Sequence, residues 1–305
     1  MKSSYFKYLL LFSSILLTFG LFAASSLAKM TKDELFRAIE KYSEENNREP
    51  IDAKIDSVWK AIPGYNGRTV DIEASYKKMK SKDNFDEKKI VYKEISPKIH
   101  LEDLANQPIY RGNPQKPMVG FLINVAWGNE YIPGILEALE KHNTKATFFF
   151  DGSWVKKNPD VAKQIKAAGH EIGNHAYSHP DLQQRSMEET KVELVKTNQV
   201  IEDTLDIKPK WFAPPSGSFN ETTVQVAEQL DMKTILWTVD TVDWKKPAAA
   251  EMVNRVMSKV ENGSMILMHP TQPVAEGMET MIKGIKGKGY TLGTVSELMS
   301  EKRID

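Results

Sequence analysis

The sequence predicts an α/β fold with a parallel sheet in residues 118–300, behind a small α+β region in residues 29–108. Short apolar runs alternate with amphipathic helical patterns throughout residues 118–300, as in strands joined by crossover helices. Residues 29–108 are rich in charge and show no such repetition. Functional side chains of a parallel sheet are expected just beyond the carboxyl ends of its strands, whether the sheet is open or closed into a barrel.

The predicted elements follow one another in a regular order. Apolar strands are expected at residues 119–125, 144–150, 211–213, 234–239 and 264–268. Helices are expected at residues 131–141, 159–168, 188–205, 222–230, 248–260 and 277–286. Upstream, Thr31 and Glu34 are spaced as a capping box before an amphipathic helix, and residues 69–74 alternate like a strand. Residues 109–117, with two prolines, are expected to link the two regions.

The amino-terminal end has the features of a secretory signal peptide. Lys2 and Lys7 make it basic, residues 8–24 are mostly apolar, and Ser26 and Ala28 are small residues at the positions that signal peptidase reads. We expect residues 1–28 to be removed by cleavage after Ala28. The alternative is an uncleaved membrane anchor, although the apolar run is short for a full span. Contact with a membrane is expected only in that case.

The composition excludes several classes of protein. The 41 basic and 41 acidic residues balance, so no basic surface argues for nucleic acid. The chain has no cysteine and therefore no disulfide, no thiolate metal ligand and no lipidated cysteine. An exported protein without cysteine is expected to be secreted to the cell envelope of a wall-bearing bacterium.

A cluster of histidines is the strongest local signal. Three of the six histidines fall in residues 170–179, and His175 and His179 are four positions apart. On a helical turn this spacing places both imidazoles on one face, where a single divalent ion can bridge them. The alternative is a pair of surface histidines that bind nothing.

Four segments together resemble the polysaccharide deacetylase family, the NodB homology domain of carbohydrate esterase family 4. They are Thr147-Phe-Phe-Phe-Asp-Gly152, Gly169-His-Glu-Ile-Gly-Asn-His-Ala-Tyr-Ser-His179, Leu236-Trp-Thr-Val-Asp-Thr-Val-Asp-Trp244 and Leu267-Met-His269. The resemblance covers about residues 118–300 and is nearest to members from spore-forming bacteria. It implies a distorted (β/α) barrel and a metal-dependent N-deacetylase acting on peptidoglycan or another N-acetylated polysaccharide.

Several positions match the site residues of that family. The resemblance implies that His175 and His179 are metal ligands, that His269 is the catalytic acid and that Asp243 orients His269. Trp244 would line the substrate groove with the loop that follows the third motif, namely Pro214, Pro215, Ser216 and Gly217. Ser216 departs from the aromatic residue usual at its position.

Three other positions do not match. Asn124 stands where the family has the general base, Val125 where it has the metal carboxylate, and Ala213 where an arginine steadies that base. A shift of the alignment does not help, because residues 118–129 contain no Asp or Glu. The losses are coupled, because an arginine facing a neutral Asn124 would be a buried cation without a partner, which costs several kcal/mol.

These departures predict a pseudoenzyme with no zinc or only weakly bound zinc. Loss of a general base alone lowers the rate by roughly 10²–10⁴. Such a protein could bind glycan or a partner in the wall or during sporulation. The alternative is an active deacetylase with a rearranged site.

Two carboxylates could rescue a rearranged metal site, Asp151 and Glu130, although a turn and a helix start explain them equally well. His170 is expected to orient its loop, and His100 and His142 to lie at the surface. Trp154, Tyr177 and Trp237 are further aromatic candidates for stacking on sugars, with Trp237 better explained as core.

Overall fold

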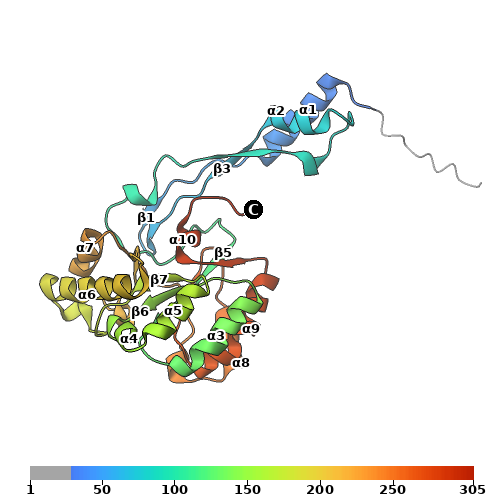
Figure 1. Ribbon diagram of the computed structural model, residues 1–305. Coiled ribbons are helices and arrows are strands. Elements are labelled where there is room, and N and C mark those ends of the chain that lie inside the picture. The colour runs from blue at the N-terminus through green and yellow to red at the C-terminus, as the bar shows by residue number, and fades with distance from the viewer. Residues whose placement is uncertain (1–28) are drawn as a thin grey trace, which may run out of the picture. The chain divides into compact units, whose positions relative to one another are not determined.

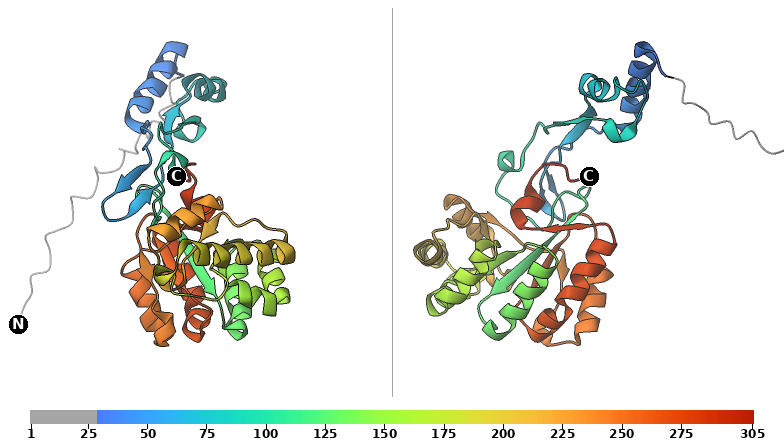
Figure 2. Two further views of the ribbon diagram at one scale, coloured as in Figure 1. Left: turned by 90° about the vertical axis from the view of Figure 1, so that its left-hand side faces the viewer. Right: turned by 45° about the vertical axis from the view of Figure 1, so that its right-hand side comes forward.

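The computed structural model describes residues 29–305, shown from three directions in Figures 1 and 2. The expected signal peptide at residues 1–28 lies outside the described residues. The described chain divides into two compact units, one formed by residues 29–46 and 70–91 and the other by residues 47–69 and 92–305. The larger unit thus contains part of the region that we expected to be a separate accessory domain.

The smaller unit is built on two helices, α1 (Lys32–Asn46) and α2 (Ile72–Met79), which lie side by side in both views of Figure 2. The expected capping box begins α1: the backbone N–H of Thr31 donates to Glu34 Oε2 at 2.8 Å, and the N–H of Glu34 donates to Thr31 Oγ1 at 3.3 Å. The apolar faces of both helices meet in a small core. That core consists of Leu35, Ile39, Val70 and Met79.

Short paired strands occupy the first part of the chain. They are β1 (Lys54–Asp56) with β2 (Lys60–Ile62), and β3 (Gly67–Val70) with β4 (Tyr92–Ile95). The strand expected at residues 69–74 ends at Val70, so that prediction is wrong for residues 71–74. Asp71 Oδ1 accepts a hydrogen bond from the N–H of Ala74 at 3.0 Å, and this cap starts α2 instead.

The larger unit contains the parallel sheet. Its strands are β5 (Met118–Val125), β6 (Thr147–Phe150), β7 (Glu171–Asn174), β8 (Trp211–Phe212), β9 (Lys233–Thr234), β10 (Val239–Asp240), β11 (Met265–Met268) and β12 (Thr291–Gly293). They run in the order β10-β11-β5-β6-β7-β8-β9, with β12 also beside β5, and every pairing is parallel. All eight residues of β5 are buried, as expected for a central strand covered on both faces.

The sheet is curled. Strands β9 and β10 lie at opposite ends of the strand order, yet only residues 235–238 separate them in the chain. Five residue steps reach at most about 18 Å, whereas seven strands side by side in a flat sheet would place their outer members about 29 Å apart. A curled sheet resolves the conflict, and the expected distorted (β/α) barrel is confirmed.

Helices surround this sheet, with α3, α8 and α9 on one side and α4, α5 and α6 on another (Figure 1). The helices are α3 (Ile132–Lys141), α4 (Gly152–Lys157), α5 (Pro159–Ala167), α6 (Met187–Leu205), α7 (Glu221–Gln229), α8 (Ala249–Met257), α9 (Gln272–Gly287) and α10 (Val295–Met299). Their apolar sides pack on the strands to form one large core. None of the helices in residues 29–305 is long and apolar enough to cross a membrane.

The segment expected to be a linker is packed into the larger unit. Asn113 and Lys116 are each only 1% exposed. The amide of Asn113 donates to the carbonyl oxygen of Pro63 at 2.9 Å. The ammonium of Lys116 donates to the carbonyl oxygens of Glu297 and Ser300 at 2.5 and 2.6 Å, at the end of α10. Burial lowers the pKa of Lys116 to about 8.

Candidate functional site

The predicted site residues gather at the carboxyl ends of neighbouring strands. Asn124 and Val125 close β5, His175 follows β7, Ala213 follows β8 and His269 follows β11. Because all these strands are parallel, their carboxyl ends meet at one end of the curled sheet, which is where barrels of this kind carry their sites.

The two histidines lie in a loop, so the helical turn that we expected is wrong. Strand β7 ends at Asn174, and Ala176 and His179 have left-handed backbone angles, with φ of 60° and 56°. The loop nevertheless brings the rings of His175 and His179 together, with centroids 5.3 Å apart and an edge-to-face arrangement. The loop, and not a helical turn, therefore brings the two rings together.

His175 is held as a neutral ring of defined tautomer. It is 1% exposed, and its Nδ1 lies 2.7 Å from the carbonyl oxygen of Ala213. A carbonyl only accepts, so Nδ1 carries the hydrogen and Nε2 keeps its lone pair. Burial, with smaller contributions from the charges of His179 and His269, lowers the pKa of His175 to about 3, and the hydrogen bond opposes this only in part.

The third ligand position has no donor atom. Val125 is completely buried and offers only methyl groups toward its surroundings. Beside it, Asn124 is 4% exposed, and its Oδ1 has no hydrogen-bond partner within residues 29–305. No group of three or more His, Cys, Asp or Glu side chains suited to a metal occurs in the described part of the chain. The donor set therefore does not fit a zinc site with three protein ligands.

His269 and Asp243 form the pair expected for an acid and its orienting carboxylate. Nδ1 of His269 lies 3.0 Å from Oδ1 of Asp243, and the backbone N–H of His269 donates to Oδ2 at 2.7 Å. Asp243 is completely buried and also accepts from Thr241 Oγ1 at 2.9 Å. These contacts fix Nδ1 of His269 as a donor and leave Nε2 for other partners.

The loop after β8 departs from the expected groove in part. Pro214 and Pro215 are buried, whereas Ser216 is exposed with a left-handed φ of 55°. Gly217 has a φ of 66°, and a Cβ atom there would lie 2.6 Å from the ring of Trp237. Trp237 and Ala213 belong to one apolar cluster. The expected arginine position is thus occupied by a small side chain in apolar surroundings.

Of the two possible rescue carboxylates, Asp151 has a structural role. Oδ1 of Asp151 accepts from the N–H of Trp154 at 2.9 Å and from Ser153 Oγ at 2.7 Å, and so caps α4. Burial raises the pKa of Asp151. Glu130 lies in a short 3₁₀ helix, Asn129–Tyr131, immediately before α3.

The side chains of His100, His142 and His170 have partners outside the pair. His170 is 7% exposed, and its Nδ1 accepts from the N–H of Ala146 at 3.3 Å. His100 is paired with Glu301 at 2.9 Å, and His142 lies 3.4 Å from Glu279.

A pocket beside His269 includes a residue that sequence reasoning missed. It has a volume of about 420 Å³ and is lined by Trp127 and Trp244 together with residues of α8 and α9. The ring of Trp127 stacks on that of His269, with centroids 5.9 Å apart and planes 10° from parallel. The sequence feature that could have indicated Trp127 is its place, two positions beyond the end of the first buried strand.

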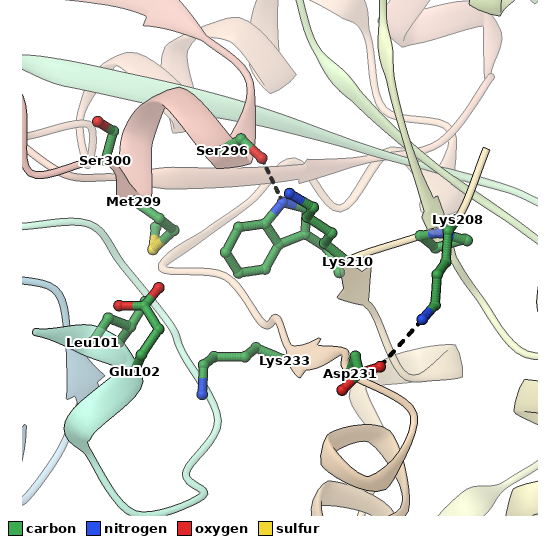
Figure 3. Close-up of a pocket in the computed structure, with 11 residues that line it drawn as sticks. Leu101, Glu102, Lys208, Lys210, Asp231, Lys233, Ser296, Met299 and Ser300 are labelled. Carbon is green, nitrogen blue, oxygen red and sulfur yellow. Dashed lines mark hydrogen bonds and ion pairs between the residues drawn. The ribbon is translucent and has the colours of Figure 1, made fainter.

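A separate pocket of about 460 Å³ opens at the other end of the strands (Figure 3). Trp211 and Lys233, which begin β8 and β9, line it together with Met299 of α10. The indole N–H of Trp211 donates to Ser296 Oγ at 2.8 Å. Lys208 is ion-paired with Asp231 at 3.1 Å (Figure 3). None of the predicted site residues contributes to this pocket.

Comparison with known proteins identifies relatives along most of the chain. The family described as polysaccharide deacetylase matches residues 111–235. YlxY of Bacillus subtilis, an uncharacterized protein, is 54% identical over 274 residues, which is 90% of this chain and 86% of that protein. The peptidoglycan-N-acetylglucosamine deacetylase PgdA of Listeria monocytogenes is 36% identical over 56% of this chain, but the match spans only 36% of PgdA.

Solved structures give the same result. The crystal structure of BA3943 from Bacillus anthracis, described as a CE4 family pseudoenzyme, is 51% identical and has a TM-score of 0.86. The alignment covers 89% of this chain and 96% of that one. A mutant of BA3943 described as having restored enzymatic activity aligns with a TM-score of 0.85 over 88% of this chain. By identity and coverage, this chain belongs to the polysaccharide deacetylase family, carbohydrate esterase family 4.

Proposed function

We propose that this protein is a pseudoenzyme of the cell envelope that binds N-acetylated glycan, such as peptidoglycan, without hydrolysing it. The observation that carries the proposal is the third ligand position, where Val125 is buried and has no donor atom. The neutral Asn124 and the apolar surroundings of Ala213 support it, because a water molecule there would have neither a general base nor an arginine beside it. The pseudoenzyme BA3943, 51% identical, supports it independently.

The same proposal includes the place of action of the protein and the roles of its amino-terminal segments. Relatives that are peptidoglycan deacetylases favour the cell wall as the place of action. Export through the signal peptide at residues 1–28, an accessory role for residues 29–108 and a connection with sporulation belong to this proposal as expectations from the sequence.

The test combines three measurements on the purified protein. Metal content is determined after exposure to zinc, acetate release is measured with chitopentaose and peptidoglycan, and binding of the same glycans is measured by calorimetry. We expect well below one zinc per chain, no acetate above a blank, and measurable glycan binding. Stoichiometric zinc together with turnover that disappears in His179→Ala would instead establish an active deacetylase with a rearranged site. Absence of any glycan binding would refute the binding role.

A further inference from the structure

The pocket shown in Figure 3 lies at the end of the sheet that the predicted site does not use. Trp211 and Lys233 begin β8 and β9, whereas the predicted site residues follow the ends of strands. Its volume of about 460 Å³ is within the range of pockets that hold small ligands. Neither His175 nor His269 lines it, so a ligand bound there would leave the predicted site free.

Segments that are distant in the sequence form the walls of this pocket. The 3₁₀ helix η2 (Leu101–Asp103) contributes Leu101 and Glu102, and α10 contributes Met299 (Figure 3). Helix η2 lies outside residues 111–235, the part of the chain that matches the polysaccharide deacetylase family. The pocket therefore depends on a segment that precedes the matched residues, and it is separate from the groove that the family resemblance implies.

The floor of the pocket is apolar and is held in place. Leu101 and Met299 are nearly buried, and the partly buried ring of Trp211 packs in the same apolar cluster. The indole N–H of Trp211 donates to Ser296 Oγ at 2.8 Å and to Glu171 Oε1 at 3.1 Å, which fixes the orientation of the ring. The indole is thus ordered before any ligand arrives, and an apolar side chain can pack on it without a further entropic cost to the protein.

The rim of the pocket carries charged side chains of both signs. They are Glu102, Lys208, Lys210, Asp231 and Lys233. Lys208 is paired with Asp231 at 3.1 Å, and Lys233 with Glu228 at 3.5 Å. Lys210 and Glu102 are exposed and form no ion pair within residues 29–305. In the described part of the chain, the rim therefore offers one ammonium and one carboxylate to a ligand.

The combination of these features selects the class of ligand. A short peptide with free ends is a zwitterion, so its ammonium complements the carboxylate of Glu102 and its carboxylate complements the ammonium of Lys210. An apolar side chain of the peptide would cover the face of Trp211 and remove apolar surface from water. A polyanion fits less well because Glu102 and Asp231 would repel it, and an uncharged apolar ligand would leave both rim charges without a partner.

We propose that this pocket is a binding site for a short peptide with free ends and an apolar side chain. The ammonium end of the peptide lies at Glu102, the carboxylate end at Lys210 and the apolar side chain on Trp211. The site needs no metal and does not depend on glycan binding, because none of the predicted site residues lines it. The peptide site thus lies at one end of the strands, and the groove implied by the family resemblance lies at the other.

The test is an NMR titration of the ¹⁵N-labelled protein with the tripeptide Ala-Leu-Ala. The six tryptophans give separate indole N–H resonances, and that of Trp211 is assigned by triple-resonance spectra and by its absence in Trp211→Phe. We expect the peptide to shift this resonance with a Kd on the order of 1 mM, because one apolar side chain and two exposed charge pairs each contribute little. Ala-Gly-Ala, which lacks the apolar side chain, should bind at least roughly tenfold more weakly.

Paired changes in the protein and in the peptide identify which end meets which residue. Lys210→Gln should raise the Kd of Ala-Leu-Ala roughly two- to fivefold and leave that of its C-terminal amide unchanged, because the amide has no carboxylate. Glu102→Gln should likewise weaken binding of Ala-Leu-Ala and leave that of its N-acetyl form unchanged. Lys163→Gln, which removes an exposed lysine on α5, is the matched control and should bind like the parent protein.

Three results would overturn the proposal. If millimolar Ala-Leu-Ala does not shift the Trp211 resonance, the pocket does not bind peptides. Shifts confined to Trp127 and Trp244 would place the peptide in the pocket beside His269 instead. Equal affinities for Ala-Leu-Ala, its amide and its N-acetyl form would show that the ends of the peptide are not recognised. The spectrum of each variant establishes that it is folded. Glycan binding is measured separately with chitopentaose, so its failure would leave the peptide site unaffected.

Discussion

His269 and the carboxylate of Asp243 are joined by two hydrogen bonds, one between ring Nδ1 and Oδ1 at 3.0 Å and one from the backbone N–H to Oδ2 at 2.7 Å. Thr241 donates to the same carboxylate at 2.9 Å, from the segment that follows β10. Asp243 thus ties the ends of β10 and β11 together. The pair has a structural role in this protein that is independent of any catalysis.

Replacement of Asp243 should therefore destabilise the fold whether or not the protein catalyses a reaction. Asp243→Ala leaves the ring and backbone N–H groups of His269 without an acceptor, and we expect the free energy of unfolding to fall by about 3–5 kcal/mol. Urea denaturation measures this change. The control is Lys208→Ala, which removes an exposed ion pair with Asp231 and should cost at most about 1 kcal/mol. Equal effects of the two variants would contradict a structural role for Asp243.

The losses at positions 124 and 213 should be energetically coupled. Ala213→Arg alone places a cation in apolar surroundings and should lower the free energy of unfolding by about 3 kcal/mol or more. In the background of Asn124→Asp the same change should cost less, because the new carboxylate pairs with the guanidinium. A double-mutant cycle by urea denaturation should give a favourable coupling of about 1–3 kcal/mol. Additive effects would show that the two positions were lost independently.

Restoring three side chains together should restore zinc binding and deacetylation. Asn124→Asp, Val125→Asp and Ala213→Arg supply the base, the third ligand and the arginine, while hydrogen bonds already orient His175 and His269. We expect about one zinc per chain and acetate release at least roughly 10² above the parent protein. The mutant of BA3943 described as having restored enzymatic activity makes this expectation reasonable. Addition of His179→Ala to the triple variant is the control and should abolish both gains.

Failure of the triple variant would be informative in one specific way. Stoichiometric zinc without acetate release would place the remaining defect in the groove, where Trp127 stacks on His269. Trp127→Gly, added to the triple variant, would then test whether that indole obstructs the substrate.

Stability should depend on pH through His170. Burial, assisted by the nearby charge of Lys145, lowers the pKa of this ring to about 4 from an ordinary value of 6.5. The fold therefore accommodates the neutral ring, and its contribution is complete above pH 6.5 and is lost as the pH falls toward 4. Between pH 7.5 and 5 we expect this histidine to reduce the free energy of unfolding by about 2 kcal/mol.

Urea denaturation of the parent protein and of His170→Gln at both pH values measures that contribution. The amide of glutamine can still accept from Ala146 but does not titrate, so the variant should lose less stability on acidification. His175 is also buried as a neutral ring and acts in the same direction, but it is common to both proteins. Identical pH profiles would rule out the assignment to His170.

Long apolar elements could be predicted from the sequence, and short ones could not. The eight-residue strand β5 and the long helix α6 agree with the predicted ranges to within a residue or two. Strand β7 was not predicted, because Glu171-Ile-Gly-Asn174 contains one large apolar residue and shows no alternation. The run at residues 234–239 was predicted as one strand but forms parts of β9 and β10, which lie at opposite ends of the sheet.

The candidate site also has features that the sequence predicts and features that it does not. The residues that match family motifs lie at the expected strand ends, because a family motif specifies both the residue type and its place relative to a strand. The stacking of Trp127 on His269 joins residues 142 positions apart, and no local pattern encodes such a contact. Likewise, the meeting of His175 with His179 depends on left-handed angles at Ala176 and His179, which residue types alone do not specify.

The hydrogen bond from His175 to residue 213 has a consequence for how activity is lost or gained in this family. The acceptor is a main-chain carbonyl, which every amino acid provides, so exchanging the side chain at 213 leaves the histidine aligned. A substitution at position 213 can therefore remove a side chain that the reaction needs while His175 keeps its orientation. The reverse substitution would restore that side chain beside a histidine that is already oriented. The backbone around His175 is therefore the same whichever side chain position 213 carries. Restoring the side chains that the family has requires no change of that backbone.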